Sequence, residues 1–362
     1  MRRFSKAAAV SSALALASGG LALALAGGSA GAQGTNAFTS YACAGGAADG
    51  TTISTDLSGL QEGGTLLLSG TCGSSTHTIS VSLPAGVTLE GSEDPDTNDG
   101  TQIDGNITDS GSGEGDTIMG LTVNCEGTGA GLDLDGWREK VQYVTTTDCV
   151  DGLELVSSTG GNVNDSFTND FFQVNSGATD YPVYVNDSGN NITDATLADS
   201  YLSGGEDGIY SNNGAGWTID GNHIYGNAAY GMYITRNWGT RIVNNYIESW
   251  GNGDAGIQVS VQPGAVGTVI ADNAVFENDA GTTGSGGGAG AGIAVFSNSC
   301  ATTACYATVS GNMIVNTDSA STSNYGIEGS GSGLTYVTGA NQVQGANATT
   351  KTLNSATKGT AV

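Results

Sequence analysis

Residues Trp217 to Asn237 read WTIDGNHIYGNAAYGMYITRN, and this stretch decides the fold because its pattern returns along the chain. It holds short runs in which apolar and polar residues alternate, and alternation with a period of two is typical of a β-strand. The unit aliphatic-x-x-Asn-x-apolar recurs at 219–224, 242–247, 270–275 and 309–314, with a weaker copy at 197–202. A Gly-aliphatic unit follows or precedes these copies at 131–134, 152–155, 208–211, 231–234, 256–259, 292–295 and 326–329, and 182–185 has Pro in place of Gly.

The spacing of these units predicts the architecture. Ile209 and Met232 hold equivalent places about 23 residues apart, and repeats of 20 to 50 residues indicate a solenoid, a propeller or an array. A propeller blade needs roughly 40 residues and four longer strands. Three short strands in each coil of about 23 residues instead predict an all-β, single-stranded parallel β-helix. Asn tolerates the left-handed backbone of a sharp corner, and its amide can bond the Asn of the next coil.

The chain divides into four expected segments. Residues 1–32 have a basic start, an Ala- and Leu-rich run and a small-x-small end, which predict a secretory signal peptide and a secreted, extracellular protein. We expect an N-terminal cap with the first coils at 33–105, parallel β-helix repeats at 106–345 and a polar C-terminal tail at 346–362. No later segment is apolar enough to predict membrane insertion.

The composition restricts the partners. The chain has 35 acidic residues against nine Lys and Arg, and its formal net charge is −26. Such a surface repels nucleic acid and anionic membranes. A polyanionic substrate would be repelled too, unless a divalent cation bridges it. We expect a monomer.

The six cysteines form an even set, which in an exported chain indicates disulfides. Cys300 and Cys305 would close a short loop. Residues 24 apart sit at similar places in neighbouring coils, so Cys125–Cys149 is predicted to join two coils. Cys43–Cys72 would close the N-terminal region.

The segments "GLQEGGTLLLSGTC…ISVSLPAGVTLEG" and "TIDGNHIYGNAAYGMYI" resemble the N-terminal coil and the repeat of right-handed parallel β-helix proteins of the pectate lyase superfamily. The resemblance implies a polysaccharide substrate lying along the sheet that the Gly-aliphatic strands form. The Gly-His-Gly and Arg-Ile-Lys motifs of polygalacturonase-type hydrolases are absent from the sequence, and so are the His-rich motifs of alginate epimerases. The superfamily also contains non-catalytic surface proteins.

The outward positions of the Gly-aliphatic strands predict a sugar-binding face. One column precedes each Gly and another lies between the two aliphatics, and both are rich in Tyr, Asp and Glu. Aromatic rings stack on sugar faces, and carboxylates accept hydrogen bonds from hydroxyls or hold Ca²⁺. The predicted substrate-binding residues are Tyr181, Tyr184, Tyr210, Tyr230, Tyr233 and Trp238.

Two reactions fit such a face. The first is the reaction of a Ca²⁺-assisted uronan lyase. The resemblance implies an Arg or Lys base for it, and Arg236 is the candidate. Glu206, Asp207 and Asp254 are the candidate Ca²⁺ ligands. In the second, inverting glycoside hydrolysis, Asp151 and Asp207 would be the two carboxyls, two coils apart on one column.

A third interpretation is a non-catalytic cell-surface or glycan-binding β-helix, which the missing motifs favour. His223 follows corner Asn222 on a different sheet, and we expect it to be an exposed structural residue. The sequence has two histidines in all and a disulfide partner available to every cysteine, which argues against zinc catalysis and Ser-His-Asp chemistry.

Overall fold

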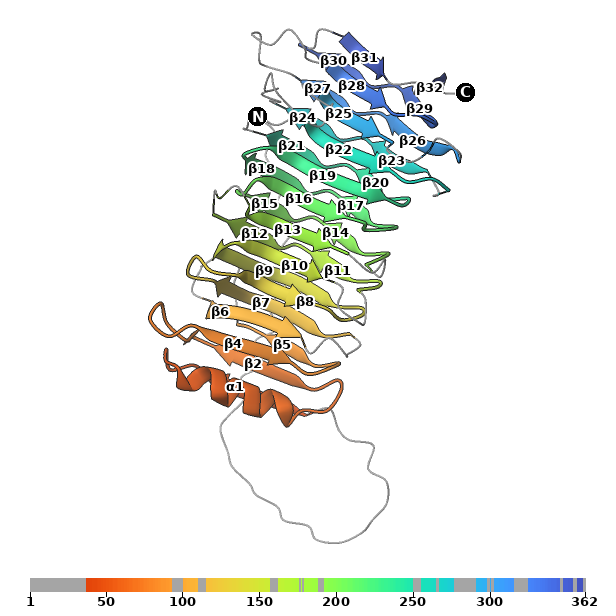
Figure 1. Ribbon diagram of the computed structural model, residues 1–362. Coiled ribbons are helices and arrows are strands. Elements are labelled where there is room, and N and C mark those ends of the chain that lie inside the picture. The colour runs from red at the N-terminus through yellow and green to blue at the C-terminus, as the bar shows by residue number, and fades with distance from the viewer. Residues whose placement is uncertain are drawn as a thin grey trace, which may run out of the picture. The chain divides into compact units, whose positions relative to one another are not determined.

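The computed structural model shows a parallel β-solenoid of about 10 turns with one short helix near its N-terminus (Figure 1). The described residues all belong to one compact unit within Asn36–Val362, and residues 1–36 lie outside them. The described residues are 37–92, 100–109, 115–156, 162–175, 177, 179–187, 192–249, 255–264, 267–276, 291–297, 300, 303–315, 325–345, 348–353 and 357–360. The predicted fold class is confirmed.

Each coil contributes a strand to each of three parallel sheets, here called the first, second and third sheets. The first sheet contains β4 (Ile79–Leu83), the second half of β6 (Thr101–Asp109), β8 (Ala130–Leu134), β10 (Asp151–Val156), β13 (Tyr181–Asn186), β16 (Asp207–Asn212), β19 (Tyr230–Asn237), β22 (Ala255–Val261), β25 (Ala291–Phe296), β28 (Tyr325–Ser330) and β31 (Ala348–Leu353).

The second sheet begins each new coil after the first-sheet strand. It contains β1 (Phe38–Ala42), β2 (Thr65–Ser69), β5 (Thr88–Glu90), the first halves of β7 (Thr117–Asn124) and β9 (Lys140–Cys149), β11 (Ser166–Thr168), β14 (Thr196–Ala198), β17 (Thr218–Asp220), β20 (Arg241–Val243), β23 (Thr268–Ala271), β26 (Cys305–Ser310), β29 (Leu334–Gly339) and β32 (Thr357–Thr360).

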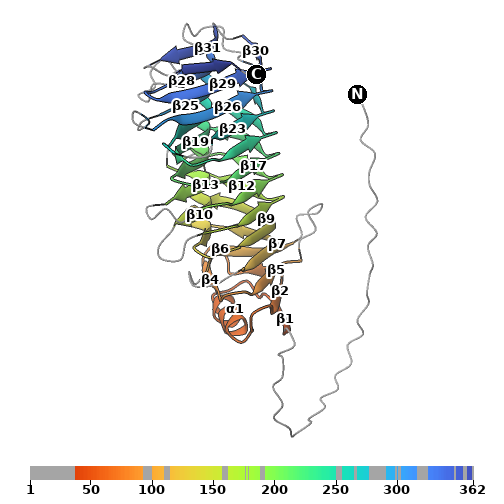
Figure 2. The ribbon, with the colours of Figure 1, turned by 90° about the vertical axis from the view of Figure 1, so that its right-hand side faces the viewer.

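The third sheet follows the second after a sharp corner. It contains β3 (Thr71–Cys72), the first half of β6, the second halves of β7 and β9, β12 (Phe171–Val174), β15 (Tyr201–Ser203), β18 (His223–Asn227), β21 (Tyr246–Ser249), β24 (Ala274–Phe276), β27 (Met313–Val315) and β30 (Gln342–Gln344). Figure 2 shows the same stack turned by 90°.

The core is a set of aliphatic columns inside the spiral. Ile219 pairs with Leu197 on one side and Ile242 on the other, and all three side chains are buried. In the same way Met232 lies between Ile209 and Ile257. The alternating sequence therefore puts one apolar side chain over the next in successive coils.

An asparagine ladder holds the corner between the second and third sheets. In each step the Nδ2 of one Asn donates to the Oδ1 of the Asn in the next coil, over 2.9 to 3.0 Å. The ladder residues are Asn222, Asn245, Asn273, Asn312 and Asn341. This confirms the predicted amide contacts between coils.

The left-handed backbone of that corner belongs to a different residue than predicted. The backbone φ angle is 57° at Asn244, 57° at Asp272 and 53° at Ala340, and each of these residues directly precedes a ladder asparagine. The ladder asparagines themselves have no positive φ. The prediction that one Asn both turns the corner and bonds the next coil is therefore wrong. The side chain must point inward to reach its partner, so the neighbouring residue makes the turn.

Helix α1 (Ala48–Ser58) covers the N-terminal end of the coil stack. Its buried side chains, Asp49, Ile53 and Leu57, are spaced by four residues and therefore share one helix face. The Asp49 carboxylate accepts hydrogen bonds from the Tyr41 hydroxyl and from the backbone N–H groups of Ala44, Gly45, Gly46 and Gly73.

All three predicted disulfides are present. The Cα atoms of Cys43–Cys72 are 4.8 Å apart, as are those of Cys125–Cys149, which joins neighbouring coils as predicted. Cys300–Cys305 closes its short loop. Among the described residues, no helix is both long and apolar enough to cross a bilayer.

Candidate functional site

The two columns predicted for the sugar-binding face lie in register on the first sheet. Glu154 pairs with Tyr184, Tyr184 with Tyr210, and Tyr210 with Tyr233. The column before it pairs Asp151 with Tyr181, and Asp207 with Tyr230. We call the outer side of β10, β13, β16 and β19 the tyrosine face.

Five half-buried tyrosines from three coils form one cluster on this face. The ring centroids of Tyr181 and Tyr184 are 5.3 Å apart and those of Tyr184 and Tyr210 are 5.4 Å apart, in stacked arrangements. Tyr233 joins Tyr210 at 5.8 Å and stacks on Tyr230 at 4.9 Å. Because the rings stack on one another, part of their faces is covered, and their edges and hydroxyls border the remaining surface.

A phenol–carboxylate pair lies beside the cluster. The Tyr181 hydroxyl donates a hydrogen bond to Glu206 Oε2 over 3.2 Å. Burial and the charges of Glu206 and Asp207 raise the pKa of Tyr181 well above its usual range, so the phenol keeps its proton at all ordinary pH values. It can donate a proton but is a poor base.

The two aspartates predicted as catalytic each bind the next coil. Asp151 Oδ1 accepts the Tyr181 N–H over 3.1 Å, and Asp207 Oδ1 accepts the Tyr230 N–H over 3.2 Å. Burial, with the charge of Glu154, raises the pKa of Asp151 to about 7; burial, with the charge of Glu206, raises the pKa of Asp207 to about 8. Asp207 is only 3 % exposed. Both carboxyls can therefore hold a proton near neutral pH, but both also support the strand that follows.

Other predicted site residues lie apart from this cluster. Arg236 is exposed, has a φ of 52° and follows Tyr233 of the cluster by three residues on β19, which at 3.3 Å per residue places its backbone roughly 10 Å from that tyrosine. Trp238 is exposed at a corner, where it bridges to Ala215. Asp254 lies outside the described residues. His223 is on the third sheet and partly exposed, as expected.

One further group, an acidic corner, was not among the site residues predicted from the sequence. Asp109, Asp116 and Glu139 each offer an oxygen, and these atoms lie within 4.8 Å of one another, so the group could hold a metal ion. It is the one such group of three among the described residues, and Glu206 and Asp207 are not part of it. The available signal was an acid directly before the second-sheet strands that begin at Thr117, Lys140 and Ser166, which are in register.

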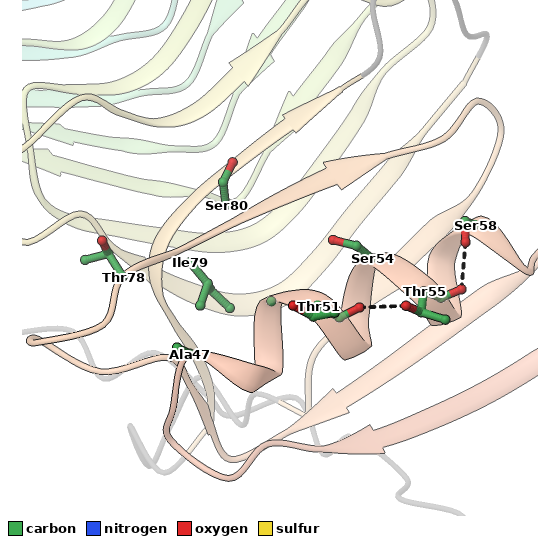
Figure 3. Close-up of a pocket in the computed structure, with 9 residues that line it drawn as sticks. Ala47, Thr51, Ser54, Thr55, Ser58, Thr78, Ile79 and Ser80 are labelled. Atoms are coloured by element: carbon green, nitrogen blue, oxygen red, sulfur yellow. Dashed lines mark hydrogen bonds between the residues drawn. The ribbon is translucent and has the colours of Figure 1, made fainter.

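A groove at the cap has a different character. It has a volume of about 560 Å³ and lies between α1 and β4, lined mainly by hydroxyl side chains such as Thr51, Ser54, Thr55 and Ser80 (Figure 3). No charged residue lines it. It offers hydrogen bonds but no group that could act as an acid or a base near neutral pH.

Comparison with known proteins agrees with the fold. Residues 174–348 match the family described as "Right handed beta helix region", which agrees with the parallel β-solenoid and the register described above. No curated protein matches the sequence.

Several solved structures share the architecture. The A-module of the Azotobacter vinelandii mannuronan C-5 epimerase AlgE4 is similar with a TM-score of 0.57 and 16% identity, over 87% of this chain and 94% of that one. The A-module of the epimerase AlgE6 from the same organism has a TM-score of 0.55 and 14% identity, over 85% and 94%. The Agl-KA catalytic domain has a TM-score of 0.53 and 13% identity, over 86% and 64%. Identities this low establish the fold alone.

Proposed function

We propose that this is a secreted, carbohydrate-active β-helix protein that binds a polysaccharide along the tyrosine face. The observation that carries the proposal is the cluster of five tyrosines from three coils, bordered by carboxylates on one sheet. Each coil advances the face by about 4.8 Å, so the row from Asp133 to Tyr233 extends roughly 19 Å along the axis. A row of this length suits an extended polymer.

The contacts proposed for the sugar follow from the stacking. Since the faces of Tyr181, Tyr184 and Tyr210 cover one another in part, the sugar meets ring edges, phenol hydroxyls and carboxylates. Phenols donate and accept hydrogen bonds, and carboxylates accept them from sugar hydroxyls. Three disulfides are consistent with an oxidising extracellular compartment.

Cleavage of the bound chain is a second proposed function, favoured by the raised pKa values of Asp151 and Asp207. In β-elimination on a uronan, a base removes the proton beside the uronate carboxylate, the C–O bond to the leaving sugar breaks, and a C=C bond forms. Tyr181 or Asp207 would donate the proton to the leaving oxygen. Arg236 is the base proposed from the sequence, and it lies at the other end of β19 from these donors.

Hydrolysis would use the same column differently. Asp151 and Asp207 are two coil steps apart, about 9.6 Å, which is near the upper end of the range for inverting enzymes. Asp207 would be the acid and Asp151 the base. Glu206, Asp207 and Asp254 remain the Ca²⁺ ligands proposed from the sequence; Asp254 lies outside the described residues, and no third acid joins the other two within them. We therefore derive no step through a metal at this face.

One set of assays separates these proposals. The protein is incubated with polygalacturonate, alginate and a neutral glucan, and bound polymer, ultraviolet absorbance of unsaturated product and released reducing ends are measured together. Binding without product supports the glycan-binding function, absorbance the lyase, and reducing ends without absorbance the hydrolase. No binding to any polysaccharide would contradict the primary proposal.

A matched pair of variants tests the location. Tyr210→Ala removes the ring at the centre of the cluster, and we expect polysaccharide affinity to fall about tenfold, as for the loss of one well-packed aromatic contact. Tyr201→Ala removes an exposed tyrosine, 52% accessible, from the third sheet. Equal losses in the two variants would place the binding surface elsewhere.

A further inference from the structure

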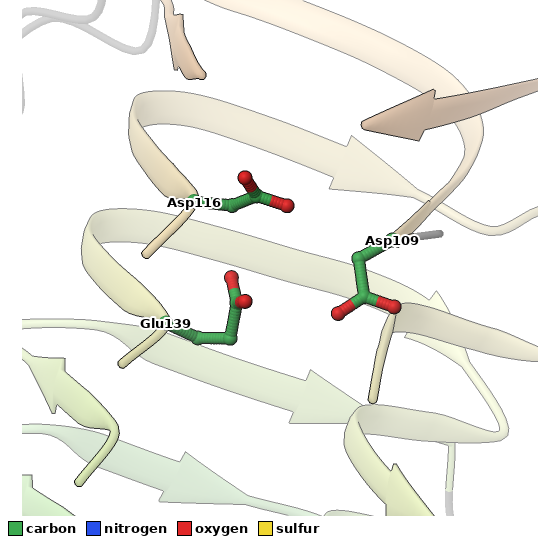
Figure 4. Close-up of side chains that lie close together, drawn as sticks. All are labelled: Asp109, Asp116 and Glu139. Carbon is green, nitrogen blue, oxygen red and sulfur yellow. The ribbon is translucent and has the colours of Figure 1, made fainter. Parts of the chain in front are cut away.

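The acidic corner lies where the first sheet turns into the second. Asp109 ends β6, Asp116 directly precedes β7, and Glu139 directly precedes β9. Figure 4 shows the three carboxylates pointing toward one another from neighbouring coils. One oxygen from each lies within 4.8 Å of the others.

Burial makes this arrangement costly without a ligand. Asp116 and Glu139 are each 1% exposed, and neither oxygen of Glu139 has a hydrogen-bond partner in the described part of the chain. A buried carboxylate without a partner is strongly disfavoured, and its acidic neighbours add repulsion. Arg138 and Lys140 flank Glu139 in the sequence, but their side chains are exposed.

The surrounding backbone holds the carboxylates in place. The Val87 N–H donates to Asp116 Oδ1 over 3.2 Å, and the Asp135 N–H donates to Asp109 Oδ2 over 2.9 Å. Gly136 makes room for the group, because a Cβ at that position would collide with Glu139 Oε1 and lie 2.8 Å from Asp109 Oδ2. These hydrogen bonds hold Asp109 and Asp116 in place, and they do not use the Glu139 carboxylate, which can therefore bind a cation.

The next coil extends the acidic column. Asp165 is 2% exposed, its Oδ1 accepts the Glu139 N–H over 3.0 Å, and its Oδ2 has no partner in the described residues. Three buried acids therefore succeed one another along this corner, with Asp109 beside them. A cation bound at Glu139 would be attracted by all four.

We propose that Asp109, Asp116 and Glu139 bind a Ca²⁺ ion that joins neighbouring coils. The donors are all carboxylate oxygens, which hard cations prefer. Two ligand oxygens on one Ca²⁺ can lie up to about 5 Å apart, so three carboxylate oxygens within 4.8 Å of one another can share one ion. Ca²⁺ also accepts irregular geometry, whereas Mg²⁺ requires a near-ideal octahedron and loses water reluctantly.

This site is structural and does not depend on the proposed function. Its acids belong to the corner column, whereas the tyrosine face is the outer side of the first sheet. A bound cation stabilises the folded state because the unfolded chain does not hold these carboxylates together.

The test compares the full chain after treatment with a chelator and after addition of Ca²⁺ or Mg²⁺. We expect saturating Ca²⁺ to raise the unfolding temperature by about 5 °C and Mg²⁺ to have a smaller effect. Tb³⁺ binding is followed by its luminescence, for which Trp137, two residues from Glu139, is a suitable sensitiser. Ca²⁺ should displace Tb³⁺.

Variants assign the ligands. Glu139→Gln should abolish the Ca²⁺-induced shift and weaken Tb³⁺ binding at least tenfold, even where removal of the buried charge makes the metal-free protein more stable. Asp109→Asn, at the partly exposed ligand, gives the same readout without altering the buried pair. Glu206→Gln, on the tyrosine face, is the matched control and should keep the full shift.

Three results would overturn the proposal. The first is a wild-type chain that neither binds Ca²⁺ nor unfolds at a higher temperature with it, which would mean that the carboxyls only share protons. The second is a Glu139→Gln variant that keeps the Ca²⁺-induced rise in unfolding temperature. The third is a Glu206→Gln variant that loses that rise. Polysaccharide binding by metal-free protein is measured in the same samples, so failure of this site and failure of the tyrosine face are distinguished.

Discussion

Asn245 offers the sharpest test of how the coils are held together. Its Oδ1 accepts hydrogen bonds from the N–H and the Nδ2 of Asn222, each over 3.0 Å. Its Nδ2 donates to Asn273 Oδ1 and to the carbonyl oxygens of Ile219 and Val243, over 2.9 to 3.0 Å. The side chain is 1% exposed, so its removal leaves these groups away from bulk water.

The expected cost of Asn245→Ala follows from the groups left without a partner. The Asn222 N–H becomes a buried donor whose described acceptor is lost, which costs about 1–3 kcal/mol. The Asn222 amide and the two carbonyls lose one contact each, and the net value of a hydrogen bond is about 1 kcal/mol. Since Asn222 Nδ2 keeps its bond to the Leu197 carbonyl, we expect a total of about 3–5 kcal/mol in the free energy of unfolding.

The neighbouring residue supplies the control. Asn244 is exposed, has a φ of 57° and donates to Asp220 Oδ1 on the surface. Glycine adopts that backbone conformation without strain, so Asn244→Gly should change the stability by less than about 0.5 kcal/mol.

Denaturant unfolding, followed by far-ultraviolet circular dichroism and by tryptophan fluorescence, gives the free energies of both variants. The two probes are needed because solenoid coils contact only their neighbours and can unfold in parts. A loss below about 1 kcal/mol for Asn245→Ala, or an equal loss for Asn244→Gly, would refute the view that the ladder amides stabilise the corner.

Three further predictions concern other contacts. Asp170 lies at the same corner two coils before Asn222, to which Ser200 links it, and its carboxylate accepts the Val144 N–H. Burial raises the pKa of Asp170 to about 8, and a raised carboxyl pKa removes stability as pH rises from about 4 to about 8. Asp170→Asn should therefore stabilise the protein at pH 9 and not at pH 4, which thermal unfolding at both pH values measures. Asp49 has its pKa held below the usual range, because hydrogen bonds from Tyr41, Ala44, Gly46 and Gly73 outweigh the effect of burial. The ionised Asp49 carboxylate contributes to the free energy of unfolding above about pH 4, and this contribution is lost as pH falls. Acidification from pH 6 to pH 3 should therefore destabilise the wild type more than Asp49→Asn. An equal loss of stability in both proteins would contradict this. Replacing Cys125 and Cys149 together by Ser removes a link across 24 residues and should lower the unfolding free energy by about 3 kcal/mol, whereas an unchanged value would show that the coils are aligned without it.

The parts of the fold that repeat could be predicted from the sequence. Each coil contributes the same local signals, namely alternation in the short strands and an Asn at the corner, so an error in one copy is corrected by the others. The register of Glu154, Tyr184, Tyr210 and Tyr233 followed directly from aligning those copies. The disulfide Cys125–Cys149 followed from the same coil length.

Features that occur once were harder to predict. Helix α1 contains Thr51, Thr52, Ile53 and Thr55, which are poor helix formers, and it forms because Ile53 and Leu57 are buried at the end of the stack. The acidic corner does not appear in the outward columns of the first sheet, because Asp116 and Glu139 directly precede second-sheet strands. An acid before a strand looks like a solvated turn residue until its neighbours in the adjacent coils are considered.

The candidate site shows a further limit of sequence patterns. Alignment of the copies placed Asp151 and Asp207 on the expected column, but it did not reveal that each carboxylate accepts a backbone N–H from the following strand. Nor did it show that Arg236, three residues after Tyr233 on the same strand, has a left-handed backbone and an exposed side chain. Aligned columns predict which residues are neighbours in successive coils. They do not predict the direction of a side chain, because that direction depends on where each strand starts and ends.

Successive rungs of the asparagine ladder are separated by 23, 28, 39 and 29 residues, yet their amides meet at the same distance each time. The spacing of the described strands is therefore independent of the number of residues that connect one rung to the next. A foreign loop inserted between two rungs, away from the strands, should likewise leave the spacing of the coils unchanged. The scaffold is thus suited to displaying added peptide at fixed intervals along a rigid axis.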